Sequence, residues 1–181
     1  GIDHYRSYSE GFTGEAVLTT NPEYVWARKS STLAANTQMS FPLKSGGWNG
    51  MAVPQKIIDN YAMYDGRTID DSSEEYPYSE SGFTTSAKSF SGYRLNSGVY
   101  NMYANREMRF YASIGFSECY WPMSSTTSSG KYNKTIAYYY DNENGKQNSA
   151  TDYTPTGYVI KKYIHSSDAW DGDNAARMEK A

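Results

Sequence analysis

The spacing of hydrophobic and polar residues predicts one clear helix near the first third of the chain. Four apolar residues recur at helical spacing: Val53, Ile57, Ile58 and Tyr61. Pro54 suits a first helical position, and Gly66 ends the pattern. A short amphipathic helix is therefore expected over residues 54–64.

Strand patterns follow later in the chain. Residues 110–117, "FYASIGFS", alternate large apolar and small side chains, with Phe110, Ala112, Ile114 and Phe116 on one side. This period of two is typical of a half-buried strand. Residues 136–147, "IAYYYDNENGKQ", predict a strand entering a turn at Asn144-Gly145, and residues 156–164, "TGYVIKKYI", predict a further strand.

The rest of the chain has weaker patterns. Residues 1–50 mix the apolar run "EAVLTT" with polar segments and end in the glycine turn "KSGGWNG". Residues 67–98, which include "DDSSEEYPYSESGF", have no regular period, and loops of this length are usually functional or disordered. We expect a loop-rich α+β fold of short helices and small β-hairpins, in one domain over residues 1–181.

Tyrosine dominates the composition. Only 38% of the 181 residues are hydrophobic, yet 19 are tyrosines. Such rings suit either recognition of a polar ligand with apolar faces or partly hydrated packing, and both remain open. The single cysteine, Cys119, excludes an internal disulfide and is expected to be a small strand hydrophobe.

The charge balance argues against nucleic acid as a partner. The chain has 17 basic and 20 acidic residues and no basic cluster longer than a pair. No window is apolar enough to span a bilayer, and the start, "GIDHYRSYSEGF", lacks a signal-peptide pattern. The last residues, "DGDNAARMEKA", resemble the approach to a helix, so we expect a longer parent protein.

No enzyme signature is found. Glycosidic hydrolysis usually needs two carboxylates about 5–10 Å apart, one with a raised pKa. The candidates, Asp70, Asp71, Glu74 and Glu75, share one polar loop that is most simply solvated. His4 and His165 lie far apart, and "DAWDGDN" places Trp170 and Gly172 where calcium ligands belong. We expect no catalytic residue, metal or cofactor.

Three ordered motifs carry a family resemblance: "VPQKIIDNYAMYDG", "YANREMRFYASIGF" with a nearby tryptophan, and "TPTGYVIKKYI". Together they resemble the SusD/RagB family of outer-membrane glycan-binding lipoproteins of Bacteroidetes. The resemblance covers residues 53–163. It implies the substrate-facing C-terminal region of such a protein, as a fragment without the tetratricopeptide-like helical scaffold of the family.

One motif departs from the family pattern. Glu107 and Met108 stand where the family has Asp-Pro, so the turn before the expected strand loses a rigid residue. Arg106 and Arg109 flank this turn, and we expect them to bind neighbouring carbonyls or carboxylates. An arginine clamp on an acidic sugar is the functional alternative.

The resemblance implies non-catalytic capture of a polysaccharide or oligosaccharide at the cell surface. The implied partners are a glycan and a SusC-like TonB-dependent transporter, and the implied location is the outer membrane, as a surface-exposed lipoprotein with its anchor outside these residues. The alternatives are a structural or adhesion domain without glycan binding, and an uncharacterised hydrolase.

Exposed flat aromatics are expected to form the binding platform, because sugar rings carry apolar C–H faces. Trp48 lies beside Asn49 in "GGWNG", and Trp121 follows Tyr120 at the expected strand exit. Tyr76, Tyr78 and Phe83 in the long loop are second choices. Either tryptophan could instead belong to the core.

Overall fold

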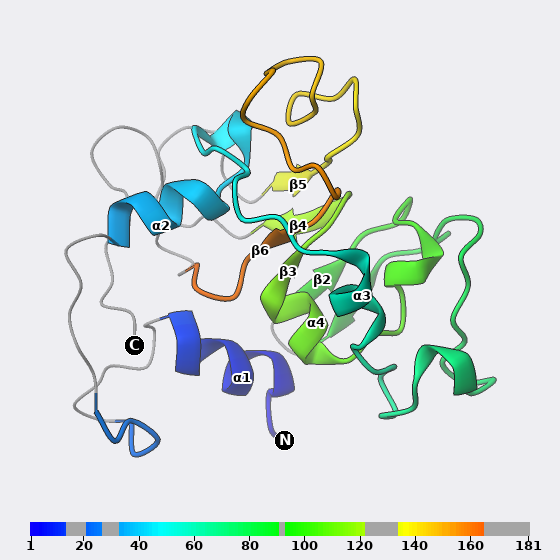
Figure 1. Cartoon of the computed structure of the whole chain (residues 1–181). Helices are drawn as coiled ribbons and strands as arrows, with labels where there is room; N and C mark the ends of the chain where they lie inside the picture. Colours follow the sequence, from blue (N-terminus) through cyan, green and yellow to red (C-terminus); the bar gives the residue numbers. More distant parts are fainter. Residues whose placement is uncertain (14–20, 27–32, 91–92, 122–133, 165–181) are drawn as a thin grey trace.

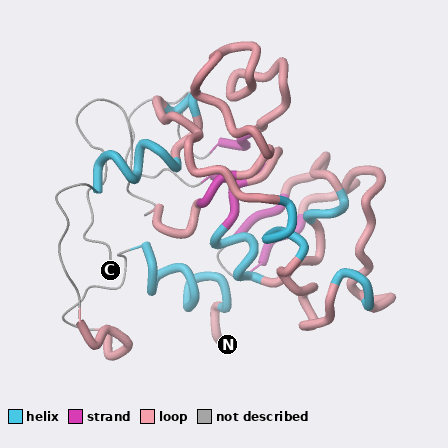
Figure 2. The backbone as a smooth tube through the Cα atoms, viewed as in Figure 1, coloured by secondary structure: helices cyan, strands magenta, loops and turns pink. Residues whose placement is uncertain are grey.

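Long loops join short helices and two-stranded sheets in this protein (Figures 1 and 2). The structure is a computed structural model, and it describes residues 1–13, 21–26, 33–90, 93–121 and 134–164. The helical elements are α1 (His4–Thr13), α2 (Leu33–Ser40), η1 (Leu43–Ser45), α3 (Gln55–Asp59), η2 (Ile69–Asp71), η3 (Asn101–Tyr103) and α4 (Met108–Ser113). The strands are β1 (Lys88–Phe90), β2 (Tyr93–Leu95), β3 (Ile114–Gly115), β4 (Cys119–Trp121), β5 (Lys134–Ile136) and β6 (Val159–Ile160).

The strands pair as three separate antiparallel ribbons, β1–β2, β3–β6 and β4–β5. Ser89 lies opposite Arg94, Ile114 opposite Ile160, and Tyr120 opposite Thr135. This mixture of short helices and small strands confirms the expected loop-rich α+β class. No helix among the described residues is long and apolar enough to cross a bilayer.

The predicted helix at residues 54–64 is present but shorter, as α3. Pro54 is extended just before its first residue. Two carbonyl oxygens at its end, those of Ile58 and Tyr61, accept hydrogen bonds from Arg106 Nη2 at 2.6 and 2.8 Å. Arg106 Nη1 binds the carbonyl oxygen of Met102 at 3.1 Å, and the side chain is fully buried. The expected structural role of Arg106 is confirmed.

The predicted strand at residues 110–117 is wrong over its first half. Met108–Ser113 form the helix α4, and only Ile114 and Gly115 pair as a strand. All of residues 110–113 are buried, so burial does not alternate along this segment. A short helix buried all round has no amphipathic pattern, and the apparent period of two was incidental.

Aromatic side chains form the centre of the core. Phe116 lies 5.1 Å from Phe110 and 4.6 Å from Tyr103, measured between ring centres. The hydroxyls of Tyr103 and Tyr158 are 3.1 Å apart, so these tyrosines keep hydrogen bonds inside the core. Cys119 is fully buried beside them in β4, as expected for a small hydrophobe.

Two regions hold more structure than the sequence predicted. The paired strands β1 and β2 lie within residues 67–98, and the rings of Phe90 and Tyr93 stack on Tyr111 at 5.6 and 4.8 Å. Helix α1 packs against α4 near the start of the chain (Figure 1). The run "EAVLTT" and the expected C-terminal helix lie outside the described residues.

Candidate functional site

Trp48 lies on a tight turn after α2 and η1, and 42% of its surface is exposed. Backbone hydrogen bonds hold the turn: Trp48 N donates to Gln38 O at 2.9 Å, and Gly50 N donates to Met39 O at 2.7 Å. A Cβ atom at Gly47 would lie 2.2 Å from Phe41 O, so only glycine fits there. The expected exposure of Trp48 is confirmed.

Asn49 has a different position from the one expected. Its side chain is fully buried, and its backbone has a φ of 48°. The amide Nδ2 donates to the carbonyl oxygens of Asn144 at 3.5 Å and Asp152 at 3.1 Å. Asn49 therefore ties the Trp48 turn to the loop after β5, and its amide does not face a ligand.

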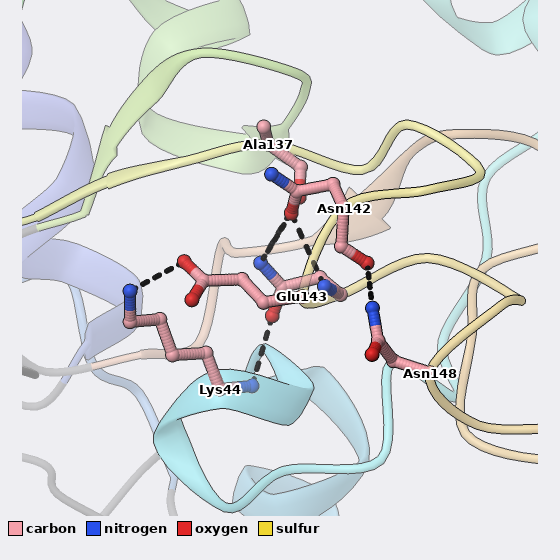
Figure 3. A network of polar contacts seen from close by, with 6 residues as sticks. Lys44, Ala137, Asn142, Glu143 and Asn148 are labelled. Atoms are coloured by element: carbon pink, nitrogen blue, oxygen red, sulfur yellow. Dashed lines mark hydrogen bonds and ion pairs between the residues drawn. The ribbon is translucent and has the colours of Figure 1, made fainter.

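Asn144 completes the same junction from the loop side. Its Oδ1 accepts a hydrogen bond from Lys44 N at 2.9 Å, and its Nδ2 donates to Ala137 O at 3.0 Å. The Lys44 ammonium pairs with Glu143, and Asn148 Nδ2 donates to Asn142 O at 2.6 Å (Figure 3). These bonds fix the loop of residues 139–148 against η1.

This loop brings further aromatic residues to the surface. Tyr139 is 44% and Tyr140 is 68% exposed. Further along, the Lys146 ammonium lies 5.3 Å from the centre of the Tyr153 ring. Sequence reasoning assigned Tyr139 and Tyr140 to a strand and missed them as site candidates. The turn signal Asn144-Gly145, which places them next to a loop, could have indicated them.

Trp121 is not displayed at a sheet edge. It is fully buried in β4, with its ring 5.8 Å from the ring of Phe41. Alternate residues of a strand share a face, so Trp121 points inward with Cys119, while Tyr120 between them is half-buried. The expectation that Trp121 stands exposed at the strand exit is wrong.

The second-choice aromatics lie in a separate region, in the loop between η2 and β1. Tyr76 is half-buried, with its ring 5.1 Å from Tyr64, and Phe83 is 57% exposed and packs on Tyr100 at 5.6 Å. Tyr78 donates a hydrogen bond to Glu80 Oε1 at 3.0 Å. Its ring lies 5.7 Å from the Arg106 guanidinium, and burial raises the pKa of its hydroxyl.

In Figure 1 this loop lies at the right of the view, beyond α3, whereas the segment with the Trp48 turn lies on the other side of α3. The structure therefore does not bring the two predicted groups of aromatics together. It places Trp48 with the loop of residues 139–148 instead.

The acidic residues of the long loop do not form a catalytic pair. Asp70, Asp71, Glu74 and Glu75 are all exposed, and Asp71 Oδ2 lies 3.7 Å from Arg67 Nη1. Among the described residues, no three histidine, cysteine, aspartate or glutamate side chains are grouped to hold a metal ion.

A second polar feature lies at the start of α4. Arg109 Nε and Glu107 Oε2 are 2.5 Å apart, and Glu107 Oε1 accepts a hydrogen bond from Ala62 N at 3.0 Å. The expectation that Arg109 binds a neighbouring carboxylate is confirmed. A hollow of about 210 Å³ lies on one side of this pair, between Ile57, Asn60 and Tyr61. Another of about 330 Å³ lies beside His4, Tyr64 and Met108.

Comparison with known proteins gives one family. The model of the SusD family matches residues 21–180 of this chain. A solved SusD-like protein from Bacteroides fragilis NCTC 9343 has a similar fold, with a TM-score of 0.59 and 20% identity over 96% of this chain and 32% of its own. BT4246, solved with selenomethionine, is 16% identical over 78% of this chain and 26% of its own, with a TM-score of 0.45. No curated protein matches significantly. This chain thus spans about a third of the first structure and about a quarter of the second.

Proposed function

Since this chain belongs to the SusD family, we propose that it captures a polysaccharide or oligosaccharide at the cell surface without cleaving it. The glycan then passes to a TonB-dependent transporter of the SusC type, and the protein is held at the outer membrane as a surface lipoprotein. Family membership supports glycan binding for nutrient uptake in general, and the finer steps are our proposal.

One observation carries this proposal: an exposed tryptophan ring on a rigid turn. Trp48 follows two glycines and precedes Asn49, whose buried amide anchors the turn to two loop carbonyls. A turn whose backbone is held in this way need not be ordered when a sugar stacks on the ring, which lowers the entropic cost of binding. Tyr139 and Tyr140 offer further rings on the anchored loop.

A glycan array followed by calorimetric titration with the best-bound oligosaccharide tests the platform. Stacking one sugar face should contribute roughly 1–2 kcal/mol, so Trp48→Ala should weaken binding about five- to thirtyfold. Trp26→Ala is the matched control, because Trp26 is 79% exposed and its segment lies far from the turn (Figure 1). Equal effects of the two variants, or none, would remove Trp48 from the binding surface.

Absence of cleavage is tested with the same oligosaccharide. We expect no release of reducing ends after prolonged incubation, because the loop carboxylates are exposed rather than set in a shielded pair. Product release that disappears when Asp70, Asp71, Glu74 and Glu75 are replaced together by amides would show a hydrolase instead.

The alternative is a structural or adhesion domain whose tyrosines serve packing and protein contact. Tyrosine burial favours this alternative, because buried rings are unavailable to a ligand. The buried tyrosines include Tyr93, Tyr103, Tyr111 and Tyr158. A glycan array with no bound sugar would support this alternative.

A further inference from the structure

The ion pair between Arg109 and Glu107 leaves one side of the guanidinium open. Glu107 is 15% exposed, and its two oxygens bind Ala62 N and Arg109 Nε. The Arg109 side chain is 59% exposed, and its Nη atoms make no hydrogen bond within the described residues. The carboxylate therefore orients the guanidinium and leaves its two Nη groups without a partner among the described residues.

The surroundings of this guanidinium combine donors with aromatic rings. Asn60 and Tyr61 line one hollow beside Arg109, and Tyr64 and His4 line another. Glu107 borders both hollows, and its two oxygens are already bound to Ala62 N and Arg109 Nε. Tyr64 is 42% exposed, and Asn60 is exposed as well. Both hollows are at or below the lower end of the roughly 300–1,000 Å³ typical of drug-sized ligands. Their size suits one or two sugar residues rather than a folded partner.

We propose that Arg109 binds the carboxylate of an acidic sugar, with Tyr61 or Tyr64 against the sugar ring. A planar guanidinium with two adjacent free N–H groups matches a carboxylate in bidentate geometry, which a neutral hydroxyl cannot reproduce. This inference rests on the proposed glycan binding and names its substrate class as carboxylated glycans. The site is distinct from the Trp48 turn, which shares none of its lining residues.

The test uses two matched pairs of ligands in calorimetric titration. Trigalacturonic acid is compared with its methyl ester, and 3′-sialyllactose with lactose. Within at least one pair, the acid should bind about tenfold more tightly than its neutral partner, as expected for a partly exposed charge-assisted bond. Raising the salt concentration from 0.05 to 0.5 M should reduce this difference.

Three variants separate the guanidinium from general effects. Arg109→Gln should abolish the preference for the acid, and Arg109→Lys should retain part of it because the charge remains without the fork. Arg94→Gln is the control, because Arg94 is an exposed arginine on β2 that lines neither hollow. A thermal melt of each variant checks that the fold is intact.

The outcomes separate this inference from the Trp48 proposal. Equal binding of acid and neutral partner, or an acid preference that survives in Arg109→Gln, overturns the acidic-sugar site. An acid preference that depends on Arg109 but not on Trp48 supports the site and contradicts the Trp48 platform. If glycan binding is lost in Trp48→Ala but unchanged in Arg109→Gln, the proposed function is supported and the acidic-sugar site is contradicted.

Discussion

The ammonium nitrogen of Lys161 lies 4.9 Å from the centre of the Tyr93 ring, and both side chains are buried. The nitrogen has no hydrogen-bond partner among the residues that the structure describes. Burial lowers the pKa of Lys161 to about 8, while burial raises the pKa of the nearby Cys119 thiol. The Tyr93 ring thus partly replaces the water that the ammonium group of Lys161 loses on burial.

Lys161→Met should stabilise the fold at pH 7 by roughly 1–3 kcal/mol, because methionine fills similar space without a buried charge. An unfolded lysine has a pKa of about 10.4, so between about pH 8 and 10 the unfolded chain holds more protons at this position. The free energy of unfolding of the wild type therefore rises with pH on account of Lys161.

Cys119 acts in the opposite sense, since its raised pKa lowers stability above about pH 8.5. Lys161 and Cys119 interact electrostatically, so the two proteins are compared in a Cys119→Ala background, in which their difference isolates the lysine. Urea unfolding from pH 7 to 9.5 should show this difference shrinking as pH rises. A constant difference would mean that Lys161 titrates with the same pKa in the folded and unfolded states.

Arg106→Met should destabilise the fold by about 2–4 kcal/mol, because it removes the charge-assisted hydrogen bonds that a buried guanidinium donates to the carbonyl groups of Met102, Ile58 and Tyr61. Urea unfolding measures the loss. Arg94→Gln, an exposed arginine, should change stability by less than about 0.5 kcal/mol. A similar loss of stability in the two variants would contradict the role of Arg106 in binding the carbonyl groups at the end of α3.

Alanine variants of the two tryptophans should differ in stability, although the sequence predicted an exposed setting for both residues. Trp121→Ala removes a fully buried ring and should cost roughly 3–5 kcal/mol. Trp48→Ala should cost less than about 1 kcal/mol, because its ring is partly exposed. Thermal melts of both variants measure the loss of stability. An equal loss in the two variants would indicate that Trp48 belongs to the core as well.

Sequence reasoning succeeded where a residue type has one strong local preference. Pro54 located the start of α3, the glycines around Trp48 located a turn, and Asn144-Gly145 located another. The class of fold followed from many such short elements. Arg106, before α4, and Arg109, within it, were also assigned correctly, since a charged group near a turn needs partners nearby.

Prediction from the sequence failed where a segment is buried on all sides, because such a segment has no periodic pattern of apolar and polar residues. Residues 110–113 are apolar or small and wholly buried, so nothing distinguishes a helix from a strand there. Trp121 was misplaced because an expected strand exit does not show on which face of the strand the side chain lies. Asn49 looked like a ligand group because its partners, Asn144 and Asp152, are distant in the sequence.

Gly145→Ala should disrupt the loop after β5, because the added Cβ would lie 1.9 Å from Tyr139 O. We expect a loss of more than about 2 kcal/mol, measured by urea unfolding. Gly98→Ala is the control: it has open space and a φ of 80°, so only backbone strain of about 1 kcal/mol is expected. A smaller effect at Gly145 than at Gly98 would contradict the tight contact.

Asn49 donates hydrogen bonds to Asn144 and Asp152, which follow it in the chain by 95 and 103 positions. A growing chain is made from its N-terminus, so the Trp48 turn emerges from the ribosome long before its anchor exists. Contacts this distant also close slowly, because a large loop must be ordered first. The surface that carries Trp48 is therefore expected to mature only after synthesis has passed Asp152, and truncated chains ending earlier should expose an unanchored tryptophan.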